Sequence, residues 1–143
     1  MTDRIGLYIH IPFCRRRCAY CDFCSFAGRE GDMPAYADAL LDEMRATPLS
    51  GRTVGTVYLG GGTPSLLGER ELSTLIEGVF RHYTIDQGAE ITCEVNPCTA
   101  DSDKLSLLKT LGVNRISMGV QSLSDRALRA LGRLHTAEEA VLA

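Results

Sequence analysis

Several features are scarce or missing in this sequence, and each absence excludes a class of protein. There is no tryptophan, and no apolar run reaches the roughly 18 residues that a membrane-spanning helix requires. The first apolar run, 5–11, contains Gly6 and His10 and ends at Pro12, which is not typical of a signal peptide. The sequence also lacks a large excess of one charge, since its net charge is -3. Nucleic-acid-binding domains, in contrast, usually carry a basic stripe. We therefore expect a soluble, cytoplasmic protein with no transmembrane segment and no nucleic-acid partner.

Cysteine, in contrast, is abundant. Six cysteines occur in 143 residues, in a chain whose 45% hydrophobic and 23% charged residues are typical of a globular protein. The cytoplasm keeps thiols reduced, so clustered cysteines there serve more often as metal ligands or redox groups than as disulfides.

The pattern of apolar residues predicts strands and helices in alternation. Four short β-rich runs predict strands buried on both faces, at 7–11, 56–59, 90–95 and 115–118. The segments after them have apolar residues at helical spacing, at 34–44, 72–80, 105–111, 124–131 and 136–143. Pro34 suits a first helical turn, Gly112 a helix C-terminus and Ser124 a helix N-cap. This order predicts an α/β fold with a parallel sheet and about four β/α units.

The predicted barrel is incomplete. A full (β/α) barrel requires roughly 200 residues or more, and this chain ends within a helical pattern. We interpret residues 1–143 as the N-terminal part of a partial (β/α) barrel, without a C-terminal domain, and expect this segment alone to lack activity.

Polar residues, glycine or cysteine follow every predicted strand. Parallel β/α folds carry their chemistry at these carboxyl ends. The glycine run 60–62 with Thr63 allows close backbone approach to a ligand, and Glu94 can accept hydrogen bonds from ribose hydroxyls or form a salt bridge. Gln121 and Arg133 are further polar positions, and for Arg133 a solvated helix position is the simplest interpretation.

The loop after the first strand carries a C-x3-C-x2-C motif. Cys14, Cys18 and Cys21 can bind three irons of a [4Fe–4S] cluster and leave the fourth iron open to S-adenosylmethionine (SAM). A zinc site completed by His10 or Cys24, or an unrelated redox trio, remains an alternative. The arginines at 15–17 could tune the cluster, dock an acidic electron donor or simply be solvated.

The other three cysteines carry weaker signals. Cys24 could be a fourth ligand, a resolving thiol or an ordinary small apolar residue, whereas Cys93 alternates within a strand and is expected in the core. Cys98 lies at the expected active face, and no role is assigned to it.

Several of these segments, in this order, resemble the HemN/HemW branch of radical SAM proteins. They are 7–14, the cysteine motif, 59–64, 94–97, 111–117, 119–122 and 132–135. The resemblance implies a radical SAM barrel and a cluster on Cys14, Cys18 and Cys21. It also implies a SAM site lined by Tyr8, Gly61 and Glu94. In the dehydrogenase branch a second SAM lies near positions that match Tyr20, Gly62, Thr63, Gln121 and Arg133.

Two activities are known in this branch. One is oxygen-independent coproporphyrinogen III dehydrogenation, and the other is a haem chaperone activity that passes haem to acceptor proteins. The dehydrogenases usually have a cysteine two residues after the third ligand, where this chain has Phe23, and a long extension before the first strand. The resemblance therefore favours the chaperone, leaves catalytic turnover open and assigns no catalytic residue. It implies haem or porphyrin, a flavodoxin-like electron donor and a haem-acceptor protein as partners, with haem as a further cofactor of the full-length protein.

Overall fold

The computed structural model describes residues 3–143, so Met1 and Thr2 of the N-terminal stretch lie outside the described residues. A four-stranded sheet forms its centre, with the strand order β1-β4-β5-β6 and every pair parallel. Its strands are β1 (Arg4–Ile11), β4 (Thr53–Gly61), β5 (Ile85–Val95) and β6 (Arg115–Met118). The four predicted strands and the α/β class are confirmed.

The strands differ from the prediction chiefly at their amino ends. β1, β4 and β5 begin three to five residues earlier than their apolar runs indicate, and the register shifts within these extensions, between Ile5 and Gly6 and between Val54 and Thr56. β5 continues there through polar or glycine residues such as Gln87 and Gly88, which have no register partner in β4. Hydrophobic patterning does not detect such an irregular strand start.

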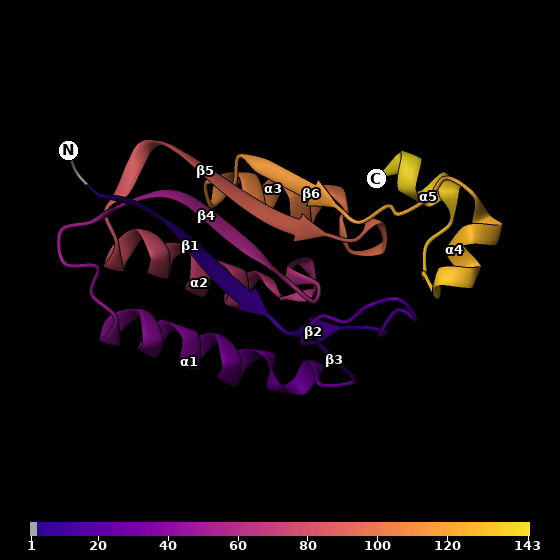
Figure 1. Ribbon diagram of the computed structural model, residues 1–143, viewed down its shortest axis with the longest axis horizontal. Coiled ribbons are helices and arrows are strands. Elements are labelled where there is room, and N and C mark those ends of the chain that lie inside the picture. The colour runs from indigo at the N-terminus through magenta and orange to yellow at the C-terminus, as the bar shows by residue number, and fades with distance from the viewer. Residues whose placement is uncertain (1–2) are drawn as a thin grey trace.

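Three helices connect consecutive strands and lie along one side of the sheet (Figure 1). These are α1 (Met33–Ala46), α2 (Glu69–His82) and α3 (Ser102–Thr110). Pro34 lies in the first turn of α1, and Gly112 follows α3 with a φ of 99°, so both predicted helix signals are confirmed. The helices and the sheet share one core, which includes the fully buried Leu59 and Leu75.

The other face of the sheet is more open than predicted. In β1 the side chains alternate, with Ile9 and Ile11 buried towards the core and Tyr8 56% exposed. The expectation of strands buried on both faces is therefore wrong for β1, because the described helices cover only one side.

Beyond β6 the chain continues into two short helices, α4 (Asp125–Leu131) and α5 (Ala137–Leu142). They lie past the carboxyl ends of the strands (Figure 1). Ser124 is the N-cap of α4 as predicted, although its side chain makes no capping hydrogen bond. Thr136 and Glu139 form a capping box at α5.

Five short elements at the carboxyl ends of the strands or between elements were not predicted. β2 (Phe13–Cys14) pairs with β3 (Phe26–Ala27) and closes the cysteine loop at its base. The others are the 3-10 turns η1 (Glu30–Asp32), η2 (Pro64–Leu66) and η3 (Pro97–Thr99). Elements of two or three residues are too short for a hydrophobic period to be recognised. Within residues 3–143, no helix has the length and apolar character needed to cross a membrane.

Candidate functional site

The carboxyl ends of β1 and β4 are joined by backbone hydrogen bonds through the glycine run. The Gly62 amide donates to the Ile11 carbonyl at 2.8 Å, and the Thr63 amide donates to the Phe13 carbonyl at 2.7 Å. A Cβ on Gly62 would lie 2.5 Å from the Phe13 carbonyl oxygen, so only glycine fits. Gly61 has a φ of 114°, which also favours glycine.

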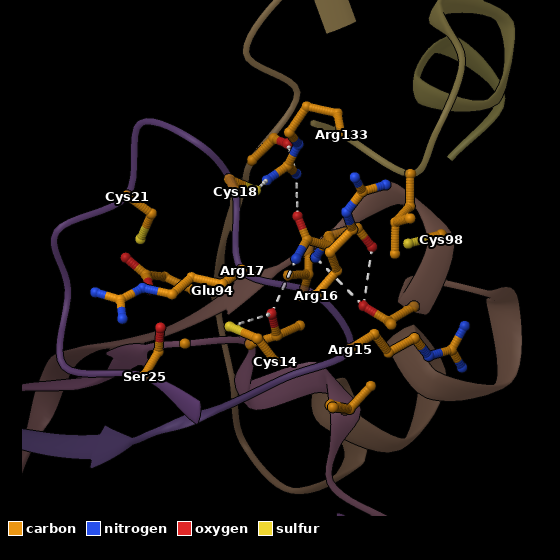
Figure 2. Close-up of a pocket in the computed structure, with 18 of the residues that line it drawn as sticks. Cys14, Arg15, Arg16, Arg17, Cys18, Cys21, Ser25, Glu94, Cys98 and Arg133 are labelled. Atoms are coloured by element: carbon orange, nitrogen blue, oxygen red, sulfur yellow. Dashed lines mark hydrogen bonds between the residues drawn. The ribbon is translucent and has the colours of Figure 1, made fainter. Parts of the chain in front are cut away.

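A cavity of about 390 Å³ opens at these strand ends (Figure 2). The cysteine loop, the glycine run, the ends of β5 and β6 and the segment after α4 all contribute to its walls. It collects ten of the eleven predicted site residues, namely Cys14, Cys18, Cys21, Tyr20, Gly61, Gly62, Thr63, Glu94, Gln121 and Arg133. The eleventh, Tyr8, is not among the lining residues.

All three motif cysteines are free thiols at the wall of this cavity. In Figure 2 the Cys14 and Cys21 thiols lie on different sides of the Arg17 and Glu94 side chains, and the Cys18 thiol lies beside Arg133. No three His, Cys, Asp or Glu side chains within residues 3–143 converge on a single point as ligands of one metal ion. A cubane cluster does not need such convergence, because each cysteine binds a different iron.

Two of the three thiols accept a hydrogen bond from another part of the chain. The Thr63 hydroxyl donates to Cys14 Sγ at 3.7 Å, and Arg133 Nη1 donates to Cys18 Sγ at 3.5 Å. Asn96 joins the two donors: its Nδ2 donates to Thr63 Oγ1 at 3.0 Å, and its Oδ1 accepts from Arg133 Nη2. One chain of hydrogen bonds therefore runs from Cys14 to Cys18 across the cavity wall.

Arg133 differs from its sequence interpretation. It is not a solvated helix residue, because it follows α4 in the segment that lines the cavity and is partly buried. Its Nη2 also donates to the Gly119 carbonyl, and its Nε is buried without a partner. Within residues 3–143 no carboxylate lies within salt-bridge distance of this guanidinium.

Glu94 is held by two donors at the end of β5. Tyr58 donates its hydroxyl to Glu94 Oε1 at 2.7 Å, and the Gly61 amide donates to Oε2 at 3.0 Å. The hydrogen bond to Glu94 raises the pKa of Tyr58, and its burial adds to the effect. This carboxylate is thus oriented at the cavity wall and forms no salt bridge within the described part of the chain.

Tyr8 lies beside the cavity on the open face of the sheet. Its ring stacks on that of Tyr58 with a centroid separation of 6.0 Å. His10 Nε2 donates to the Cys24 carbonyl at 2.8 Å, and His10 Nδ1 and the Tyr8 hydroxyl share a hydrogen bond at 3.0 Å. The structure therefore ties Tyr8 to the cysteine loop through His10.

Gln121 and the three arginines at 15–17 also line the cavity and have features that bear on ligand binding. Gln121 is a non-glycine residue with a φ of 68°, a conformation that often marks functional sites. The arginines at 15–17 line the cavity with exposed side chains, and none of them pairs with a carboxylate within residues 3–143.

The remaining three cysteines differ in burial. Cys93 is fully buried as predicted, and burial raises the pKa of its thiol to about 12. Cys24 is exposed and does not line the cavity, so it is not an ordinary core residue. Cys98 is exposed and lines the cavity.

The donor set fits a three-thiolate iron–sulfur cluster. Besides the donors on Cys14 and Cys18, two buried polar atoms at the cavity have no partner in the described chain: Ser25 Oγ and Arg133 Nε. Buried donors normally have partners, so unpartnered ones at a cavity indicate a bound group that accepts hydrogen bonds. The thiolates and sulfides of a cubane are such acceptors.

Sequence reasoning missed the roles of Ser25, Asn96 and His135. His135 is buried and donates from Nε2 to the Val120 carbonyl at 3.0 Å. Asn96 and His135 lie in segments singled out as motifs, which was their available signal. Nothing in the sequence marked Ser25, because its burial depends on the closure of the loop by β2 and β3.

Comparison with known proteins places this site in context. The family model described as Radical SAM superfamily matches residues 8–143. Heme chaperone HemW of Escherichia coli is 44% identical over 140 residues, which are 95% of this chain and 37% of that protein. The mitochondrial radical S-adenosyl methionine domain-containing protein 1 of Bos taurus is 39% identical over 98% of this chain and 32% of its own length.

A solved structure matches the fold closely. Coproporphyrinogen III oxidase (HemN) from Escherichia coli, described as a radical SAM enzyme, aligns with a TM-score of 0.88 and 33% identity. The alignment covers 96% of this chain and 32% of that one. The chain thus spans about a third of the length of the relatives it matches.

Proposed function

The chain belongs to the radical SAM superfamily, in the branch that contains HemW and HemN, and from this we propose that it binds a [4Fe–4S] cluster and SAM as part of a haem chaperone. Members of this superfamily generally use these two cofactors. The observation that carries the proposal is the cavity in which Cys14, Cys18 and Cys21 meet the glycine run and Glu94. We propose residues 1–143 as the N-terminal part of the radical SAM core domain.

The side chains have separate tasks in this proposal. Cys14, Cys18 and Cys21 would hold the cluster through three of its irons, and SAM would bind in the cavity beside them. When bound, the cluster would supply an electron for the reductive cleavage of SAM. Thr63 and Arg133 donate hydrogen bonds to two ligand sulfurs and so orient them.

The other wall of the cavity recognises SAM. Gly61 and Gly62 allow the backbone to approach the methionyl group, and Glu94, oriented by Tyr58, accepts from the ribose hydroxyls. We propose that Tyr8 lines this first SAM molecule from the open face of the sheet. Thr63 and Arg133 already donate hydrogen bonds to cysteine sulfurs. A second SAM molecule near Tyr20, Gly62 and Gln121 would have to bind to Thr63 and Arg133 while they keep these hydrogen bonds.

The haem chaperone is favoured over the dehydrogenase by the Cys21-Asp22-Phe23 sequence and by the relatives named HemW. The close structural match to HemN keeps oxygen-independent coproporphyrinogen III dehydrogenation as the second candidate. Haem or porphyrin is the proposed ligand of the whole protein, and a haem-binding acceptor protein is its proposed partner.

The unpaired arginines at 15–17 suit an acidic, flavodoxin-like electron donor, since they surround the cluster ligands with positive charge. A reducing compartment such as the cytoplasm is required to keep the thiols available.

Metal analysis of the protein reconstituted anaerobically tests the cluster. We expect about four irons and four sulfides per chain, and a change in the paramagnetic resonance spectrum of the reduced cluster when SAM is added. Replacing Cys14, Cys18 or Cys21 with serine should abolish most of the iron binding. Cys24→Ser is the matched control, because Cys24 lies on the same loop, is exposed and does not line the cavity.

Zinc without iron or sulfide would refute the cluster and support a zinc-binding module. For the intact protein, haem binding and transfer to an acceptor is the expected activity. Formation of protoporphyrinogen from coproporphyrinogen III, with SAM and reductant, would instead establish the dehydrogenase.

A further inference from the structure

Ser25 is a buried hydroxyl that the proposed site has not yet used. The residue is 6% exposed, lines the cavity, and its Oγ has no hydrogen-bond partner within residues 3–143. Leaving a buried hydroxyl unpaired costs stability, so such groups are rare unless a bound group pairs with them. In Figure 2 the Ser25 oxygen and the Cys14 and Cys21 thiols lie around the side chains of Arg17 and Glu94.

The three motif cysteines differ in the hydrogen-bond donors that their sulfur atoms have. Cys14 Sγ accepts from Thr63, and Cys18 Sγ accepts from Arg133. No hydrogen bond to Cys21 Sγ occurs among the described residues, although its backbone amide donates to the Cys18 carbonyl at 3.1 Å. Cys21 is therefore the motif cysteine for which the described residues supply no donor, and Ser25 on the same loop has an unused hydroxyl that lines the same cavity.

The backbone on both sides of Ser25 is fixed by contacts that do not involve a cluster. The Phe26 amide donates to the Pro12 carbonyl at 2.7 Å, and Phe26 pairs with Phe13 between β3 and β2. On the other side, the Cys24 carbonyl accepts from His10. Ser25 is thus presented to the cavity by the fold, as expected of a preorganised supporting residue.

We propose that the Ser25 hydroxyl donates a hydrogen bond to the sulfur atoms at the Cys21 corner of the cluster, so that each of the three ligand cysteines has one dedicated donor. The inference rests on the proposed cluster. Hydrogen bonds to cluster sulfurs stabilise the more negative, reduced state and so raise the reduction potential. Ser25 is in this sense a positioning and tuning residue and takes no part in bond cleavage.

A redox titration of the reconstituted protein tests this role. At the midpoint potential of the unaltered protein, Ser25→Ala should lower the ratio of reduced to oxidised cluster about fivefold, the effect of one net hydrogen bond. Ser25→Thr keeps the hydroxyl and should restore most of the ratio. Ser117→Ala is the control, because Ser117 lines the same cavity from β6 and is not part of the cysteine loop.

An unchanged potential in Ser25→Ala, or an equal shift in Ser117→Ala, would overturn the inference. If Ser25→Ala does not fold, the crystal structure of the unaltered protein with its cluster decides the question. There, Ser25 Oγ must lie within hydrogen-bond distance of Cys21 Sγ or of an adjacent sulfide, and any other placement contradicts the proposal. A wild-type sample without iron would instead refute the proposed function itself, which keeps the two failures distinct.

Discussion

At the scale of single residues, the six cysteines lie in three different environments. Three line the cavity within the motif, Cys24 and Cys98 are exposed, and Cys93 is fully buried in β5. Sequence patterning predicted the motif and the burial of Cys93, because both depend on local spacing. It also placed Cys98 at the active face, where the structure has it lining the cavity, but it assigned no role to this residue.

The thiol of Cys93 should be almost inert to alkylation in the folded protein. Its pKa of about 12 keeps it protonated at pH 8, and only the thiolate is an efficient nucleophile. Cys24 and Cys98, which are exposed, should react with iodoacetamide within minutes, whereas Cys93 should react only after denaturation. Mass spectrometry of the labelled peptides measures this, and equal labelling of Cys93 and Cys24 in the native protein would contradict it.

Hydrogen bonds link residues that are distant in the chain. Glu94 was predicted as a site residue, but its donor Tyr58 was not, although Tyr58 lies in the neighbouring strand. The sequence indicates which face of a strand is apolar, whereas cross-strand partners follow from register, which the structure alone supplies.

At the scale of elements, the glycine run 60–62 at the end of β4 makes a close backbone contact with the end of β1 and with β2. Gly62 lies against the backbone of β1 and β2, and its amide and that of Thr63 hydrogen bond across the gap. The contact also positions Thr63 for its hydrogen bond to Cys14. Any side chain at Gly62 must push these elements apart.

Gly62→Ala should therefore lower both stability and cluster content. The new Cβ would lie 2.5 Å from the Phe13 carbonyl oxygen, and relieving that overlap should cost about 1–3 kcal/mol of unfolding free energy. Urea denaturation measures the stability, and iron analysis measures the cluster.

Gly88→Ala in β5 is the matched control, because a Cβ there meets nothing within 4 Å. Its effect should stay within about 0.5 kcal/mol, as for most surface substitutions. Equal losses in the two variants would show that the close approach at Gly62 is not responsible.

At the scale of the whole molecule, the sheet has β1 and β6 as its edges. Large apolar side chains are exposed near and beyond β6, among them Ile116 at 38% and Leu123 at 69%. An exposed edge strand with apolar side chains can pair with another copy. The described surface therefore favours self-association of this segment.

We expect the 143-residue chain to associate as its concentration rises, and Ile116→Lys to reduce that association. A charged residue on an edge strand opposes edge-to-edge pairing. Sedimentation velocity over a concentration series gives the measurement.

Leu123→Lys is the comparison, since Leu123 is exposed but lies outside the strand. Equal effects of the two variants would point to general hydrophobic association rather than to the strand edge.

The sequence by itself determined the α/β class, the four strands, the helices and the clustering of Cys14, Cys18 and Cys21 on one loop of the candidate site. These depend on short-range signals: hydrophobic period, proline and glycine positions, and the spacing of thiols on one loop. The family resemblance added Tyr8 and Tyr20 to the candidate site residues and supplied expected roles for the others.

Only the tertiary structure decided which side chains meet across the cavity. Asn96 bridges Thr63 and Arg133, Tyr58 orients Glu94, and Ser25 is buried with its hydroxyl free. Each of these relations joins segments far apart in the chain or depends on loop closure by β2 and β3. They arise because parallel strands bring their carboxyl ends to one edge, and no local pattern in the sequence encodes the distances there.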